Sequence, residues 1–340
     1  MLAMHSGMAE EFTRRRRQLL RLMGKDAIAV LPAAPERTRN GDVLYNFRQD
    51  SDFHYLTGFG EPDAVGVLIP GRPQGEFVMF VRERNAEREI WDGKRCGPEG
   101  MRRDYGADDA FPIDDIDEIL PGLIESRARV YYTMGKYHDF DQRVVSWVNT
   151  LRAQSRAGAH PPQEFVALDH VLHDMRLFKS RRELALMRRS GQIGAGAHIR
   201  AMQFCRPGRT EYEVMAELVH EFGRHGADIS YHPIVGGGAN SCVLHYSANN
   251  QPLKAGDLLL IDAGCEHEYY ASDITRTFPV NGRYSPEQRA VYEVVLAAQH
   301  AAFAKVKPGN HWNEPHDAAV RAITRGLVRL GLRKGPLARL

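Results

Sequence analysis

The chain has few of the features that mark secreted or membrane-bound proteins. Its 340 residues include only four cysteines, Cys96, Cys205, Cys242 and Cys265, and no two of them form a CxxC pair. Such wide spacing indicates reduced thiols rather than a disulfide framework or a zinc ribbon. The first residues lack the apolar core of a secretory signal, and no apolar run approaches the roughly 20 residues of a membrane span. These absences predict a cytoplasmic protein.

An excess of charge of one sign is also lacking. The formal net charge is +2, so the chain has no global field to attract nucleic acid or an anionic membrane. The most basic run, Arg14 to Arg17, lies on a predicted amphipathic helix whose other side carries Phe12 and Leu19. We interpret this run as a solvated helix face. The sequence therefore predicts neither a nucleic-acid partner nor a membrane partner.

The composition, in turn, is that of a folded protein of more than one domain. Hydrophobic residues make up 43% and charged residues 26% of the chain, which is typical of globular proteins. A length of 340 residues favours two domains. We expect an α/β domain over residues 1–176 and a second domain over residues 177–340.

Short apolar runs alternate with helical patterns in the first domain. We predict strands at Ala27 to Leu31, Ala64 to Ile69, Phe77 to Val81 and Val130 to Thr133, and helices near residues 9–23, 114–123 and 140–153.

The second domain is predicted to begin with helices and then to change to strands. A helix predicted at 169–178 spans the boundary near residue 176, and beyond it we expect helices at 179–191, 211–225, 286–306 and 318–330, and strands at 231–235, 241–246, 257–263 and 269–280. These strands are too few to cover the predicted helices, so we expect this domain to be incomplete at Leu340.

Two aspartates carry the strongest chemical signal. In LLLIDAGCEHEYYASDITRTFPVNG, residues 258–282, an apolar run leads into Asp262 and a second strand carries Asp273. If the hairpin turn centres between His267 and Glu268, the two aspartates face each other at about 5 Å between Cβ atoms. Carboxylates this close repel each other unless a cation lies between them. On spacing alone, the alternative is that one aspartate caps a turn and the other pairs with Arg276.

Hard oxygen ligands at this spacing suit manganese or magnesium. A two-metal site, with ions about 3.5–4 Å apart, can bridge and deprotonate a water that attacks a peptide carbonyl.

This hairpin resembles the metal-binding hairpin of the pita-bread metallopeptidases, which include methionine aminopeptidase, prolidase, creatinase and aminopeptidase P. The resemblance rests on IDAG followed eleven positions later by the aspartate of SDITRTFPV. It implies that Asp262 and Asp273 are metal ligands. It also implies that His245, in SCVLHYSANN, lies on the substrate side of the metals, where an imidazole could hydrogen-bond the scissile carbonyl.

The first half of the chain resembles aminopeptidase P in particular. The segments FRQDSDFHYLTGFGEPDAV, residues 47–65, and MRLFKS, residues 175–180, carry this resemblance. It implies an α/β amino-terminal domain, an α+β pita-bread domain, manganese ions, a homo-oligomer and a peptide substrate with proline in second position. It places Asp42 at the substrate's amino end and Trp91 in its pocket.

The resemblance also predicts that the metal centre lacks some of its ligands. The family's metal centre uses five protein ligands, and the histidine and two glutamates that follow the aspartates are not found before Leu340. Two divalent ions carry four positive charges against the two negative charges of the aspartates, so we expect weak metal binding and little activity. The alternatives are a prolidase or creatinase-like hydrolase and a non-catalytic peptide-binding module.

Overall fold

The structure, a computed structural model, describes residues 6–334 and divides into two compact units. The first unit ends at Phe178 and the second begins at Lys179. The outermost residues of the two expected domains, 1–5 and 335–340, lie outside the described residues. Within residues 6–334, no helix has the length and apolar character needed to cross a bilayer.

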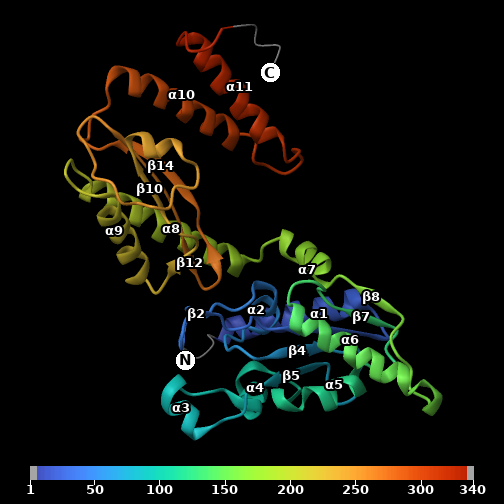
Figure 1. Cartoon of the computed structure of the whole chain (residues 1–340). Helices are drawn as coiled ribbons and strands as arrows, with labels where there is room; N and C mark the ends of the chain where they lie inside the picture. Colours follow the sequence, from blue (N-terminus) through green and yellow to red (C-terminus); the bar gives the residue numbers. More distant parts are fainter. Residues whose placement is uncertain (1–5, 335–340) are drawn as a thin grey trace. The chain divides into compact units, whose positions relative to one another are not determined.

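The first unit is built on a six-stranded sheet with strand order β6-β5-β4-β1-β7-β8 (Figure 1). Its strands are β1 (Ala27–Pro32), β4 (Val65–Leu68), β5 (Phe77–Val81), β6 (Asp109–Pro112), β7 (Arg129–Tyr131) and β8 (Glu164–Val166). Strand β4 runs antiparallel to both of its neighbours, whereas the other adjacent pairs are parallel. The carboxyl ends of the five parallel strands therefore meet at one edge of the sheet.

Helices cover both faces of this sheet. The helices of this unit are α1 (Ser6–Met23), α2 (Ser51–Thr57), α3 (Ala86–Asp92), α4 (Gly97–Tyr105), α5 (Ile116–Ile124), α6 (His138–Ala153) and α7 (Leu168–Leu177), and all but α3 contribute to a core. Side chains of α1, α2, α4 and α7 share one core with Ala29 and Leu31, and those of α5 and α6 share the other with Ile28 and Val30. A strand buried on both faces needs a continuous apolar run, which is why AIAVL has no polar alternation.

The predicted strands and long helices of the first unit are all found. Sequence reasoning missed β6, β8, several short helices and the β2–β3 hairpin (Thr38–Asn40 and Val43–Leu44). The sequence of β6, DAFP, has no alternating pattern, and α3 buries none of its side chains. Such elements are set by their neighbours rather than by their own sequence.

The second unit places two helices against two small sheets. Its elements are α8 (Arg181–Phe204), α9 (Glu211–Gly223), β9 (Asp228–Ile229), β10 (Ile234–Gly237), β11 (Leu258–Ala263), β12 (Cys265–His267), β13 (Tyr270–Ala271), β14 (Ile274–Pro279), α10 (Pro286–Phe303) and α11 (Glu314–Arg329). The strand orders are β10-β11-β14 and β13-β12-β9. Capping boxes at Ser180, Thr210 and Ser285 begin α8, α9 and α10, because each side chain satisfies an otherwise unpaired helix amide.

The strand predicted at residues 241–246 is wrong. A short 3-10 helix, Gly238–Cys242, lies there and irregular chain follows it. The buried carboxylate of Glu211 organises this loop, accepting hydrogen bonds from the Gly237 amide (2.8 Å), the Asn240 amide group (2.9 Å) and the Tyr246 hydroxyl (2.8 Å). Burial opposes ionisation of Glu211, but these hydrogen bonds hold its pKa below the ordinary value. The contacts of Glu211, which is distant in sequence, therefore outweigh the local pattern that predicted a strand.

Candidate metal centre

The two aspartates lie on the predicted hairpin, but in a different register. Strand β11 pairs with β14 so that Asp262 is opposite Thr275. The hairpin then continues through β12 and β13 to a tight turn at Glu268 and Tyr269, whose φ angles are 49° and 68°. Two positive φ values match the twist of a two-residue hairpin. The turn thus centres one residue later than predicted, and the expected direct pairing of Asp262 with Asp273 is wrong.

The two carboxylates nevertheless meet at one side chain. The hydroxyl of Tyr231 lies 2.9 Å from Oδ1 of Asp273 and is also in hydrogen-bond contact with Oδ1 of Asp262. Burial and these two acceptors raise the pKa of the Tyr231 phenol well above its ordinary value. A phenol carries one proton, so it can satisfy only one of the two carboxylates at a time. This shortage of positive charge is the condition that a bound cation would relieve.

The turn-cap and arginine-pair alternative for the aspartates finds no support. Nη1 of Arg276 donates to the carbonyl of Thr275 at 2.8 Å. In the part of the chain that the structure describes, no ion pair joins Arg276 to either aspartate.

A close chain crossing fixes the distance between the two aspartates. A Cβ atom at Gly264 would lie 1.7 Å from the carbonyl oxygen of Ser272, so only glycine fits. Ser230 closes the crossing: its amide donates to the Gly264 carbonyl at 3.1 Å, and its hydroxyl donates to the Ser272 carbonyl at 3.0 Å. The glycine of IDAG therefore has a packing role against the break between β13 and β14 in which Asp273 lies.

His245 lies beside the pair. A cavity of about 400 Å³ is lined by Tyr231, His232, Ile234, His245, Tyr246, Ser247, Asp262 and Asp273. His245 is exposed and lies on the irregular segment after the 3-10 helix rather than on a strand. Sequence reasoning gave Tyr231 no role and missed His232, whose Nε2 lies 3.2 Å from the Ser247 carbonyl oxygen. Their place directly before the apolar strand β10 was the available signal.

The donor atoms at this site are of the type that a hard divalent cation prefers, but they are too few to hold one tightly. Two carboxylate oxygens around a phenol oxygen match the preference of manganese or magnesium for oxygen. Within residues 6–334, however, no group of three or more His, Cys, Asp or Glu side chains is arranged to hold a metal ion.

Asp42 and Trp91 belong to the first unit, whereas the aspartate pair belongs to the second. Asp42 lies in the exposed turn between β2 and β3. Trp91 lies on α3 and its side chain is 85% exposed. An indole this exposed has apolar area available for contact with a ligand.

Comparison with known proteins agrees with both units. The model described as "Aminopeptidase P, N-terminal domain" matches residues 12–131, and "Metallopeptidase family M24" matches residues 185–335. The chain is 44% identical to the Xaa-Pro aminopeptidase of Escherichia coli K12, with 97% of this chain and 76% of the relative covered. It superposes on the aminopeptidase PepP of Pseudomonas aeruginosa with a TM-score of 0.96 and 59% identity, covering 97% of this chain and 75% of the other.

A zinc-substituted E. coli aminopeptidase P in complex with product is also similar, with a TM-score of 0.94 and 44% identity over 97% of this chain and 75% of that one. The matched fold and the carboxylate pair define a metallopeptidase hydrolase that uses a divalent metal. The chain belongs to the aminopeptidase P family. The predicted enzyme class, Xaa-Pro aminopeptidase, and the predicted order of an α/β domain before a pita-bread domain are confirmed.

Proposed function

We propose that this protein releases the amino-terminal residue from peptides whose second residue is proline. The observation that carries the proposal is the convergence of Asp262 and Asp273 on the single hydroxyl of Tyr231. Asp262 is half-buried and Asp273 is exposed, and two carboxylates that share one proton repel each other unless a cation joins them. The Xaa-Pro name of the similar enzymes supplies the substrate class.

Asp262 and Asp273 would hold the metal, with Tyr231 orienting both carboxylates. We propose manganese, because oxygen donors of this kind favour hard ions. When bound, such an ion supplies Lewis-acid activation of water and of the carbonyl.

The remaining steps use groups of the chain itself. His245 lines the cavity that contains the aspartates, and its imidazole would hydrogen-bond the scissile carbonyl as negative charge develops there. The carboxylate of Asp42 would attract the substrate's ammonium group, and the exposed indole of Trp91 would pack on the proline ring. We propose that a homo-oligomer, a dimer or a tetramer, supplies both residues, as the resemblance to aminopeptidase P implies.

The number of metal ligands limits the activity we expect. The described residues supply two carboxylates and no cluster of three or more ligands. We therefore propose that a polypeptide of these 340 residues binds manganese weakly and cleaves Xaa-Pro peptides slowly.

The decisive experiment titrates Mn²⁺ into the chain and follows the free ion by electron paramagnetic resonance. Asp262→Asn and Asp273→Asn should each weaken binding by roughly tenfold or more, since each removes a charged donor. Asp228→Asn, a matched change at an exposed aspartate of the same unit, should leave it unchanged. Equal binding in all four proteins would remove the basis of the proposal.

The same four proteins should be given an Xaa-Pro tripeptide and its Xaa-Ala counterpart. Cleavage of the first alone, lost in the two site variants, supports the substrate assignment. Cleavage of both peptides at the same rate would contradict it.

A further inference from the structure

The carboxyl edge of the first unit's sheet carries two adjoining cavities. One, of about 600 Å³, lies beyond β5 and β6, and the other, of about 570 Å³, lies beyond β1 and β7. They share Asp63, Ile113 and Arg143 as lining residues. Open α/β sheets most often bind ligands outside the carboxyl ends of their strands. The larger of the two, which we call the arginine cavity, also has the side chains of a binding site.

Two arginines in this cavity have unused hydrogen-bond donors. Arg82 follows β5, and its Nη2 lies 3.5 Å from Glu61, while Nη2 of Arg95 lies 3.7 Å from Asp92. Their side chains are only 18% and 17% exposed. Among residues 6–334, neither guanidinium donates a hydrogen bond, and the Nε of each is buried without a partner. A guanidinium has five N–H donors, so each arginine retains capacity for an acceptor.

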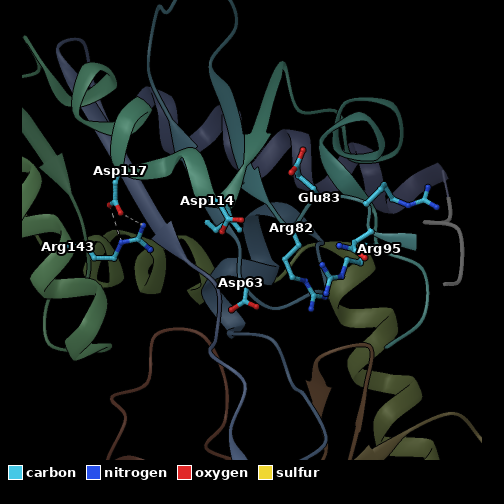
Figure 2. Close-up of a pocket in the computed structure, with 10 residues that line it drawn as sticks. Asp63, Arg82, Glu83, Arg95, Asp114, Asp117 and Arg143 are labelled. Carbon is cyan, nitrogen blue, oxygen red and sulfur yellow. Dashed lines mark hydrogen bonds and ion pairs between the residues drawn. The ribbon is translucent and has the colours of Figure 1, made fainter. Parts of the chain in front are cut away.

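The other two arginines of the cavity are already engaged. Arg84 donates to Glu89 at 2.8 Å through Nη2 and also through Nε. Arg143 pairs with Asp117 at 3.0 Å (Figure 2). These two pairs neutralise themselves. Arg82 and Arg95 are therefore the two arginines of the cavity whose guanidinium groups donate no hydrogen bond within residues 6–334.

Carboxylates in the same cavity limit what can bind there. Asp63 and Asp114 are exposed and form no hydrogen bond or ion pair through their side chains with the described residues. Figure 2 shows Arg82 and Arg95 reaching into the same part of the cavity, with Asp63 nearby and Glu83 turned away from them. A purely anionic ligand such as phosphate would meet the arginines but be repelled by the aspartates. A molecule that carries both charges would satisfy both sets.

We propose that the arginine cavity binds the zwitterion of a short peptide. Its carboxylate would accept hydrogen bonds from Arg82 and Arg95, a geometry that guanidinium groups favour. Its ammonium group would lie near Asp63 and Asp114. A cavity of about 600 Å³ is in the usual size range for small-molecule sites. The inference goes beyond the proposed function and involves neither Asp262 nor Asp273.

The test is isothermal titration of the full chain with alanyl-alanine in the presence of EDTA, so that no metal can bind the peptide. Blocked forms of the probe separate the two charges: acetyl-alanyl-alanine lacks the ammonium group, alanyl-alanine amide lacks the carboxylate, and inorganic phosphate is anionic only. The unblocked dipeptide should bind at least tenfold more tightly than the three other probes, since each loses one charged contact.

Variants then locate the site. Arg82→Gln and Arg95→Gln should weaken alanyl-alanine binding roughly tenfold, whereas Arg129→Gln, an exposed arginine paired with Glu164 at the amino end of β7, should not. Asp114→Asn covers the case in which an arginine variant fails to fold, because Asp114 is exposed. It should weaken alanyl-alanine binding but not acetyl-alanyl-alanine binding. Phosphate binding as tight as the dipeptide, or equal dipeptide binding in Arg129→Gln and Asp114→Asn, would overturn the proposal.

Discussion

Each unit contains a pair of close aspartates, and the two pairs are satisfied in different ways. In the first unit, Asp50 accepts from Lys136 at 2.5 Å, and Asp52 accepts from Arg176 at 2.6 Å. In the second unit, Asp262 and Asp273 share one tyrosine and form no ion pair within residues 6–334. The first pair is complete as folded, whereas the second lacks a cation. The cations around the first pair favour a structural role for it, whereas the second pair is the candidate for a functional site.

The surroundings of Asp50 show how fully the first pair is compensated. Its Oδ1 caps helix α2 through the amides of Asp52 (2.9 Å) and Phe53 (3.0 Å), and its Oδ2 also accepts from the Tyr137 hydroxyl at 3.0 Å. Burial acts against ionisation, but Lys136 and these donors lower the pKa of Asp50 below its ordinary value.

The strongest way to break the comparison is to separate the second pair. Gly264→Ala would put a methyl group against the Ser272 carbonyl and move the strands that carry the aspartates. We expect a loss of about 3 kcal/mol or more in the free energy of unfolding, measured with urea, from overpacking. Gly191→Ala is the control, because it lies in α8 with open space around its Cβ position and should be neutral or stabilising. Equal stability of the two variants would show that the crossing is not tight.

The next largest effect should come from removing a cation from the first pair. Lys136→Met leaves Asp50, with a side chain only 8% exposed, without its closest positive charge. We expect a loss of about 2 kcal/mol, less than for a fully buried pair because Lys136 itself is 37% exposed. Lys305→Met, whose partner Glu314 has a side chain 38% exposed, should have a much smaller effect.

The loss in Lys136→Met should depend on pH in a defined direction. A carboxyl whose pKa is lower in the folded state stabilises the fold above its unfolded pKa of about 3.9, and this contribution is lost as the pH falls through the folded value. The stability gap between the original chain and Lys136→Met should thus be full above about pH 5 and narrow below about pH 4. A gap that is constant from pH 3 to pH 7 would contradict an ionised Asp50 in the fold.

The smallest predicted effect is a gain in stability, whereas the predictions above are losses. In EDTA, Asp262→Asn removes one of two carboxylates that share a single proton. We expect it to raise the free energy of unfolding by up to about 1 kcal/mol, from relief of charge repulsion. With excess Mn²⁺ the order should reverse, because the original chain gains more from binding than the variant does. Destabilisation of Asp262→Asn in EDTA would mean that the pair is satisfied without metal.

The sequence predicted the two-unit organisation and the central strands better than it predicted the geometry around the two aspartates. Apolar runs such as AIAVL and LLLIDA determine their own conformation by burial, so they can be recognised locally. The register of the hairpin turn could not be predicted from local sequence, because Glu268 and Tyr269 are not the Asn-Gly pair that usually marks two positive φ angles. The irregular segment around His245 depends on Glu211, about thirty residues earlier in the chain, and no local pattern reports such a contact.

Strand β4 has a consequence for how the chain is made. The three neighbouring strands β5, β4 and β1 all lie before residue 82 and pair through antiparallel contacts, so this part of the sheet leaves the ribosome before β6 does. Half of the first unit's sheet can therefore assemble while the ribosome is still adding α5 and α6, the helices that cover one of its faces. Until those helices emerge, the apolar side chains of Ile28, Val67 and Phe80 are exposed to solvent on the nascent chain. This is the interval in which the nascent chain is most prone to aggregation and most in need of a chaperone.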